Sequence, residues 1–277
     1  MNPLISGSVA LLLVSVGVSA EELIEEAHPA GDSSAFNESQ AADLTTLRNM
    51  KFGEGLSAPG LGAASAGAYK EALNNILTQW DTLKTETGDP KNHYDVIIQA
   101  GHYRRNAGAT GAKGKAVSEQ KLVAYIVKVA SDKIKSRGDM RVLVLSADEY
   151  SPGLKTRLFL AVHADGSEKP CTTGPSLSYQ KPDSTLAMHA IGWGLSQSLG
   201  YKFPEFRKDG FTVNSSKYYM YSKINASVMN GLLEVGEITC PKKERELIAS
   251  ADSIGLNLAR AISFVLDATP VVSASNK

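Results

Sequence analysis

The sequence has neither an excess of charge that would indicate a class of partner nor enough cysteines for a disulfide-rich scaffold. Its 277 residues include 29 Lys and Arg and 29 Asp and Glu, so the formal net charge is zero. Because no basic excess is present, the sequence gives no support for a nucleic-acid partner. Only two cysteines occur, Cys171 and Cys240, which excludes a disulfide-dense scaffold and a four-cysteine zinc module. The length suffices for one large domain or two small ones.

The sequence also lacks a hydrophobic run long enough to span a membrane comfortably. Residues 4–18 are mostly apolar, and Val18-Ser19-Ala20 supplies the small residues that a signal peptidase prefers, although no Lys or Arg precedes the run. We therefore predict a signal peptide over residues 1–20 and an exported protein of the periplasm or extracellular space. The mature chain is expected to have no membrane span.

Residues 21–93 are expected to form an N-terminal extension. Its first part is acidic and then rich in Gly, Ala and Ser, which is typical of a flexible segment. Apolar residues at three- and four-residue spacing then predict one amphipathic helix over about residues 67–86. We expect its apolar stripe, which includes Ile76, Leu77 and Leu83, to pack on the domain that follows.

Strand-length and helix-length segments alternate through residues 94–268. The expected strands cover residues 96–99, 141–145, 157–163 and 231–235, and the expected helices cover residues 118–135, 185–199 and 243–266. This alternation favours a single α/β domain with a mainly parallel or mixed twisted sheet, flanked by helices on both faces. Residues 269–277 are expected to be a flexible tail.

Two of the expected strands lead into a histidine. His102 follows the first strand directly after Gly101, and His163 ends the third. Glu119 begins a helix and lies on its inward face, where a carboxylate needs a partner. A single strand-end histidine is more often structural, but two histidines and a glutamate with an open fourth position suit a catalytic zinc. We predict that His102, Glu119 and His163 bind Zn2+, and that the glycines between His102 and Glu119 let this loop fold close to the metal.

Glu234 lies in the apolar strand 231–235, where a lone buried carboxylate would be costly. A second carboxylate beside a metal site can take a proton from water and pass it to a leaving nitrogen. Glu234 is therefore the predicted general base. Glu237, three residues later, is expected at the surface.

Four segments together resemble the zinc-dependent N-acetylmuramoyl-L-alanine amidases of the Amidase_3 type, which are cell-wall amidases. The segments are Gln99-Ala100-Gly101-His102, Glu119, Val162-His163-Ala164-Asp165 and Leu232-Leu233-Glu234-Val235-Gly236, and the resemblance covers roughly residues 94–267. It implies hydrolysis of the amide between N-acetylmuramic acid and L-alanine in peptidoglycan, by a zinc-activated water with Glu234 as base. Peptidoglycan is thus the expected partner, and a protein activator is left open.

Gln99 stands where the family usually has Asp, two residues before Gly-His. A neutral amide can still orient His102 by a hydrogen bond, but the charge is lost. This departure keeps open a catalytically weak or inactive exported peptidoglycan-binding protein of the same fold. A zinc peptidase or deacylase acting on another amide is the second alternative, which the absence of His-Glu-x-x-His spacing disfavours.

The two cysteines follow two of the site residues at short distances. Cys171 lies eight residues after His163, and Cys240 six after Glu234, so we expect both on loops that leave the same edge of the sheet. In an oxidising compartment we predict that they form a disulfide. The alternative is two unpaired thiols on separate loops.

Overall fold

The computed structural model describes residues 66–106, 108–180, 185–200 and 215–269, all of which belong to the unit Asn37–Lys277. The predicted signal peptide, the first part of the extension and the tail from residue 270 lie outside these residues. None of the described helices combines the length and the apolar character needed to cross a bilayer.

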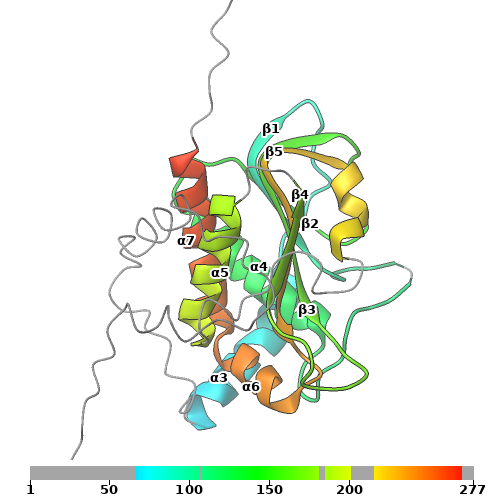
Figure 1. Ribbon diagram of the computed structural model, residues 1–277, viewed down its shortest axis with the longest axis vertical. Helices are drawn as coiled ribbons and strands as arrows, with labels where there is room; N and C mark the ends of the chain where they lie inside the picture. The colour runs from blue at the N-terminus through cyan, green and yellow to red at the C-terminus, as the bar shows by residue number, and fades with distance from the viewer. Residues whose placement is uncertain (1–65, 107, 181–184, 201–214, 270–277) are drawn as a thin grey trace, which may run out of the picture. The chain divides into compact units, whose positions relative to one another are not determined.

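Five strands form one mixed sheet in the order β2-β1-β3-β5-β4 (Figure 1). The strands are β1 (His93–Ala100), β2 (Val142–Leu145), β3 (Leu154–Asp165), β4 (Ser176–Gln180) and β5 (Ile224–Glu237). Strands β1, β2, β3 and β5 are parallel, and β4 pairs antiparallel with β5. The predicted α/β fold with a mixed sheet is confirmed, while β4 was not expected from the sequence.

The two faces of the sheet are covered unequally. Three helices pack on one face, namely α4 (Glu119–Lys135), α5 (Thr185–Leu199) and α7 (Ala251–Ala268). The other face, among the described residues, carries the short 3-10 helix η4 (Tyr219–Ser222), drawn in yellow in Figure 1. Helical segments thus flank both faces, as predicted, and in the described part of the chain Met220 and Tyr221 of η4 pack on the second face.

Strand alternation explains which residues enter each of the two cores. Ile98, Leu160 and Val235 point to the face of α4, α5 and α7 and belong to the larger core. Ile97 and Phe159 point to the face of η4 and belong to the smaller one. Burial on both faces explains why the central strands read as near-continuous apolar runs.

The N-terminal helix packs on the domain, as expected from its stripe. It consists of α3 (Ala66–Gln79) and a 3-10 turn, η1 (Trp80–Thr82), and lies against α4 and α6 (Pro241–Ala249). Ile76 and Leu83 are buried in the larger core. Leu77 is the exception, because 42% of it is exposed.

The predicted single helix over residues 243–266 is wrong in one respect, because the chain turns at Ser250 and forms α6 and α7 separately. Ser250 has φ −104° and ψ 4°, outside the helical region. Helix α6 contacts α3 and β5, whereas α7 contacts α4 and α5. The apolar spacing continues across Ser250, so periodicity alone does not reveal the break.

The carboxyl ends of the three central strands meet at one edge of the sheet. Ala100 pairs with Val162, and His163 pairs with Glu234. Open α/β sheets bind their ligands at this edge. The predicted disulfide is confirmed, since Cys171 and Cys240 are bonded, with their Cα atoms 4.7 Å apart.

Candidate metal centre

The three predicted ligands come together at the carboxyl edge. One nitrogen or oxygen atom from each of His102, Glu119 and His163 lies within 4.8 Å of the other two. Oε1 of Glu119 is 3.0 Å from Nδ1 of His163 and 3.5 Å from Nε2 of His102. The two imidazole rings stand nearly perpendicular, with centroids 5.0 Å apart.

His102 reaches the centre because the chain leaves β1 through an unusual backbone conformation. Its φ of 57° is left-handed, which is uncommon for a residue other than glycine, although histidine adopts it more readily than most, and such conformations cluster at functional sites. The preceding Gly101 passes so close to His163 that a Cβ atom would lie 2.5 Å from the ring. Nδ1 of His102 donates to the carbonyl of Ala109 at 2.8 Å, which leaves Nε2 free for a metal.

Glu119 is the first residue of α4 and is held from two directions. Its Oε2 accepts a hydrogen bond from the amide of Ala112 at 2.7 Å, and its Oε1 accepts one from the amide of Ala164 at 3.2 Å. Gly111, with φ 87°, passes so near that a Cβ there would lie 2.7 Å from Oε2. The prediction that loop glycines allow a close approach is confirmed at Gly111, while a Cβ at Gly108 would meet nothing within 4 Å.

The protonation states favour metal binding. Burial raises the pKa of Glu119, but the hydrogen bond and charge of His163, with the charge of His102, bring it below its usual value, so the carboxylate is ionised. Burial lowers the pKa of His102 and favours the neutral imidazole. A carboxylate and neutral imidazole are the forms that a metal requires, and this donor set suits Zn2+.

Glu234 lies beside this cluster, in register with His163. Only 7% of it is exposed, and its Oε2 atom has no hydrogen-bond partner. Burial, with the negative charges of Glu119 and Asp165, raises the pKa of Glu234 well above its usual value. A cation at the cluster would offset this unfavourable environment, so the orphaned oxygen fits a bound metal.

The structure corrects the expected role of Gln99. This residue is fully buried, and Nε2 donates to the carbonyls of Ser146 and Ala147 at 3.0 and 3.2 Å. Its Oε1 accepts a hydrogen bond from the hydroxyl of Tyr218 at 2.7 Å. Gln99 therefore does not orient His102, because strand alternation points its side chain to the face covered by η4.

Tyr218 is a site residue that the sequence did not single out. Its hydroxyl oxygen lies 3.3 Å from Nε2 of His163, and the two rings meet edge to face with centroids 5.5 Å apart. Burial, followed by the influence of Tyr219, raises the pKa of Tyr218, so the hydroxyl keeps its proton. No spacing in the sequence marks it, because it reaches His163 from 55 residues away.

The expectation that Glu237 lies at the surface is wrong. Glu237 is fully buried, and its carboxylate accepts hydrogen bonds from the amides of Cys171 and Thr173 at 2.6 and 2.8 Å and from the hydroxyl of Thr239 at 2.9 Å. Burial opposes the charge, but these hydrogen bonds and Lys243 bring the pKa of Glu237 below its usual value. It anchors the loop that carries the disulfide.

A second buried glutamate, Glu244 on α6, was also missed. Its Oε1 accepts hydrogen bonds from the amides of Ala116 and Val117 at 2.7 and 3.1 Å. These amides immediately precede α4, so Glu244 supports the loop that delivers Glu119. In the sequence, Glu244 is a glutamate in the first turn of an amphipathic helix, and a glutamate in that position is usually solvent-exposed.

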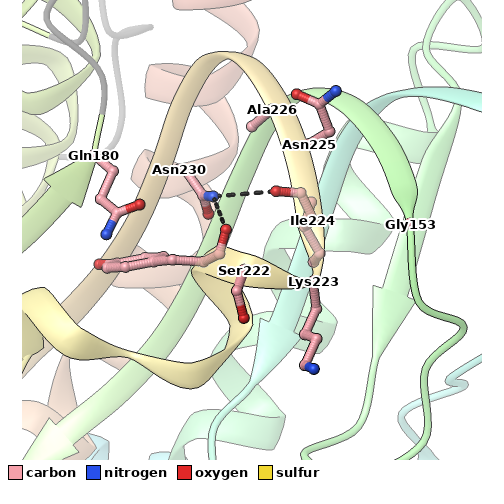
Figure 2. Close-up of a pocket in the computed structure, with 9 residues that line it drawn as sticks. Gly153, Gln180, Ser222, Lys223, Ile224, Asn225, Ala226 and Asn230 are labelled. Atoms are coloured by element: carbon pink, nitrogen blue, oxygen red, sulfur yellow. Dashed lines mark hydrogen bonds between the residues drawn. The ribbon is translucent and has the colours of Figure 1, made fainter.

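A pocket lies at the opposite edge of the sheet, where β5 begins (Figure 2). In it, Nδ2 of Asn230 donates to the carbonyls of Tyr221 and Ile224, each at 3.3 Å. None of the predicted site residues lines this pocket. The predicted site residues therefore lie at the carboxyl edge of the sheet, away from this pocket.

The fold and the cluster define an α/β domain with two histidines and a glutamate at the carboxyl edge of its sheet. No family model and no curated protein matches the chain. The fold is that of the catalytic domain of CwlV, an N-acetylmuramoyl-L-alanine amidase from Bacillus (Paenibacillus) polymyxa. The match has 21% identity and a TM-score of 0.50, and covers 64% of this chain and 99% of that one.

Two further solved structures are similar. An N-acetylmuramoyl-L-alanine amidase from Clostridium difficile 630 matches with 17% identity and a TM-score of 0.49, over 65% of this chain and 100% of that one. The CwlD amidase from Clostridioides difficile, in complex with the GerS lipoprotein, matches with 18% identity and a TM-score of 0.48, over 64% of this chain and 100% of that one.

Proposed function

We propose that this protein is a zinc-dependent amidase that hydrolyses the bond between N-acetylmuramic acid and L-alanine in peptidoglycan. One observation carries the proposal. His102, Glu119 and His163 converge within 4.8 Å, beside the unpartnered Oε2 of Glu234. The shared fold with the CwlV catalytic domain supports peptidoglycan as the substrate.

His102, Glu119 and His163 are the residues that would hold the ion, through Nε2, a carboxylate oxygen and Nδ1 respectively. When bound, zinc lowers the pKa of water toward neutrality and polarises a carbonyl oxygen. Three protein ligands leave a position open for this chemistry. The backbone amides of Ala112 and Ala164 hold Glu119 in place while substrate enters.

Glu234 is the proposed general base and acid. It takes a proton from the attacking water and delivers it to the nitrogen that leaves with L-alanine. Its buried position raises its pKa, which favours the protonated form that serves the leaving nitrogen. The nearby positive charge of the metal favours the ionised form needed in the first step.

We also propose that the protein works outside the cytoplasm. Peptidoglycan lies there, and the disulfide between Cys171 and Cys240 is typical of an oxidising compartment. Intact-mass measurement of the exported protein is expected to find a chain that begins near Glu21. A mature protein that retains Met1 would contradict the proposed signal peptide.

The function is tested by incubating purified sacculi with the protein, with and without a chelator, and measuring the mass of released products. The expected products are free stem peptides with an L-alanine amino terminus, lost on chelation and restored by zinc. Binding to sacculi without release would support the binding-protein alternative. Release of a different amide fragment would support the zinc peptidase or deacylase.

A further inference from the structure

We infer that Tyr218, held by Gln99, positions the imidazole of His163 so that its Nδ1 atom faces Glu119 and would be the nitrogen that binds a metal. This inference rests on the zinc site of the proposed function and assigns it a positioning residue. It also gives a role to Gln99, the residue at which the sequence departs from the resembled family.

The two nitrogens of His163 face different partners. Nδ1 is 3.0 Å from Oε1 of Glu119, the same oxygen that lies 3.5 Å from Nε2 of His102. Nε2 is 3.3 Å from the hydroxyl oxygen of Tyr218. Because Glu119 and His102 are the other two ligands, Nδ1 is the atom of His163 that can join them, and Nε2 is left for Tyr218.

The hydrogen-bond direction follows from the amide of Gln99. Its Nε2 donates to the carbonyls of Ser146 and Ala147, which can only accept, so the orientation of the amide is determined. Oε1 of Gln99 must then accept the hydroxyl proton of Tyr218 at 2.7 Å. The oxygen of Tyr218 is left as an acceptor for the N–H at Nε2 of His163. Nδ1, which faces Oε1 of Glu119, is then the nitrogen that would exchange its proton for a metal.

The surrounding side chains keep Tyr218 in this position. Its ring contacts those of Tyr219 and Tyr221, with centroids 4.7 and 5.8 Å away. The hydroxyl of Tyr219 donates to the carbonyl of Ala147, which also accepts from Gln99. Metal-bound histidines usually donate their second N–H to a fixed acceptor. His102 uses the Ala109 carbonyl in this way, and His163 uses the phenol of Tyr218.

The test is the zinc affinity of Tyr218→Phe, measured without substrate by competition with a chelator of known affinity. Loss of an outer partner of a metal ligand typically weakens binding about 10- to 100-fold, and this is the expected result. Tyr221→Phe is the matched control. Tyr221 lies on η4, the 3-10 helix whose N-cap is Tyr218, and its hydroxyl donates to the Ser178 carbonyl at 3.0 Å. The zinc affinity of Tyr221→Phe should equal that of the parent.

A spectroscopic measurement on the zinc-loaded parent tests the same inference without any variant. Nitrogen NMR of His163 should show a protonated Nε2 and a metal-bound Nδ1. A metal-bound Nε2, or equal zinc affinity in Tyr218→Phe and the parent, would overturn the positioning role. A parent that binds zinc as expected but leaves sacculi intact would contradict the proposed hydrolysis alone, and a parent that binds no zinc would contradict both.

Discussion

Strand β5 ends with two buried glutamates, three residues apart, in opposite surroundings. Glu237, in the region of the disulfide loop, accepts hydrogen bonds from two amides and a hydroxyl, and its pKa is lowered. Glu234, in the region of the metal centre, has an oxygen without a partner, and its pKa is raised. Burial is common to both, so burial does not mark the functional carboxylate. The functional carboxylate is instead marked by an oxygen without a hydrogen-bond partner and by a raised pKa.

The two regions also differ in what their carboxylates hold. Glu237 and Glu244 accept backbone amides and thereby fix loops. Glu119 also accepts two backbone amides, but its Oε1 faces Nδ1 of His163, and Glu234 faces the charge of Glu119. We therefore expect substitutions in the first pair to change stability and substitutions in the second pair to change metal binding and catalysis.

The largest effect is expected for Glu119→Gln. It replaces a charged ligand, so zinc affinity should fall by more than the roughly 100-fold that marks loss of an outer partner. Metal analysis after dialysis measures it, with Glu237→Gln as the control that keeps its zinc. Full zinc content in Glu119→Gln would break the distinction between the two regions.

Removing the disulfide is expected to act on stability. Cys171 and Cys240 close a loop with a sequence separation of 69. In the chain-entropy model, the free energy of unfolding should fall by up to about 4 kcal/mol when both cysteines are replaced by serine. Denaturant unfolding measures the change. Zinc content should stay at the parent level, and its loss would show that the disulfide loop also supports the metal centre.

For Glu237→Gln the free energy of unfolding is expected to fall by a smaller amount, about 1.5–3 kcal/mol, because charge-assisted hydrogen bonds to the loop are weakened. The folded pKa of Glu237 is lowered, so its contribution is present above the unfolded pKa of about 4.3 and is lost as pH falls through the folded pKa. Thermal unfolding between neutral and acid pH should therefore show a shallower acid limb in the variant. An acid limb equal to that of the parent would contradict this account.

The smallest effect is expected for Glu234→Gln in metal-free protein, where the substitution should raise the free energy of unfolding instead of lowering it. The folded pKa of Glu234 is raised, so its contribution to the stability of the metal-free parent is fully present below the unfolded pKa of about 4.3 and is lost as pH rises toward the folded pKa. At neutral pH the variant should be more stable by roughly 1–3 kcal/mol. Thermal unfolding in chelator measures this, and a destabilised variant would mean that Glu234 has a structural partner.

Local patterns were sufficient to predict much of this molecule. Apolar runs and helical spacing located the central strands, and helix α5 has the predicted bounds. The placement of His102 and His163 at the ends of strands, together with the resemblance to the amidase family, predicted that they meet Glu119 at one edge of the sheet. The disulfide followed from the same argument.

The features that the sequence did not reveal depend on distant partners. Strand β4 has two serines in five residues and owes its place to pairing with β5. Gln99 looked like an orienting group for His102 until the face of its strand was known. Tyr218 and Glu237 act on atoms 55 and 66 residues away, so neither local spacing nor residue type reveals their roles.

The most direct test of the central claim compares sacculus hydrolysis and zinc content in Glu234→Gln, with Glu237→Gln as the control from the same strand. We expect Glu234→Gln to keep near-full zinc while hydrolysis falls about 100- to 10,000-fold, the usual cost of a lost general base. Folded Glu237→Gln should hydrolyse at close to the parent rate. A zinc-loaded Glu234→Gln that still releases stem peptides at that rate would contradict the proposed mechanism.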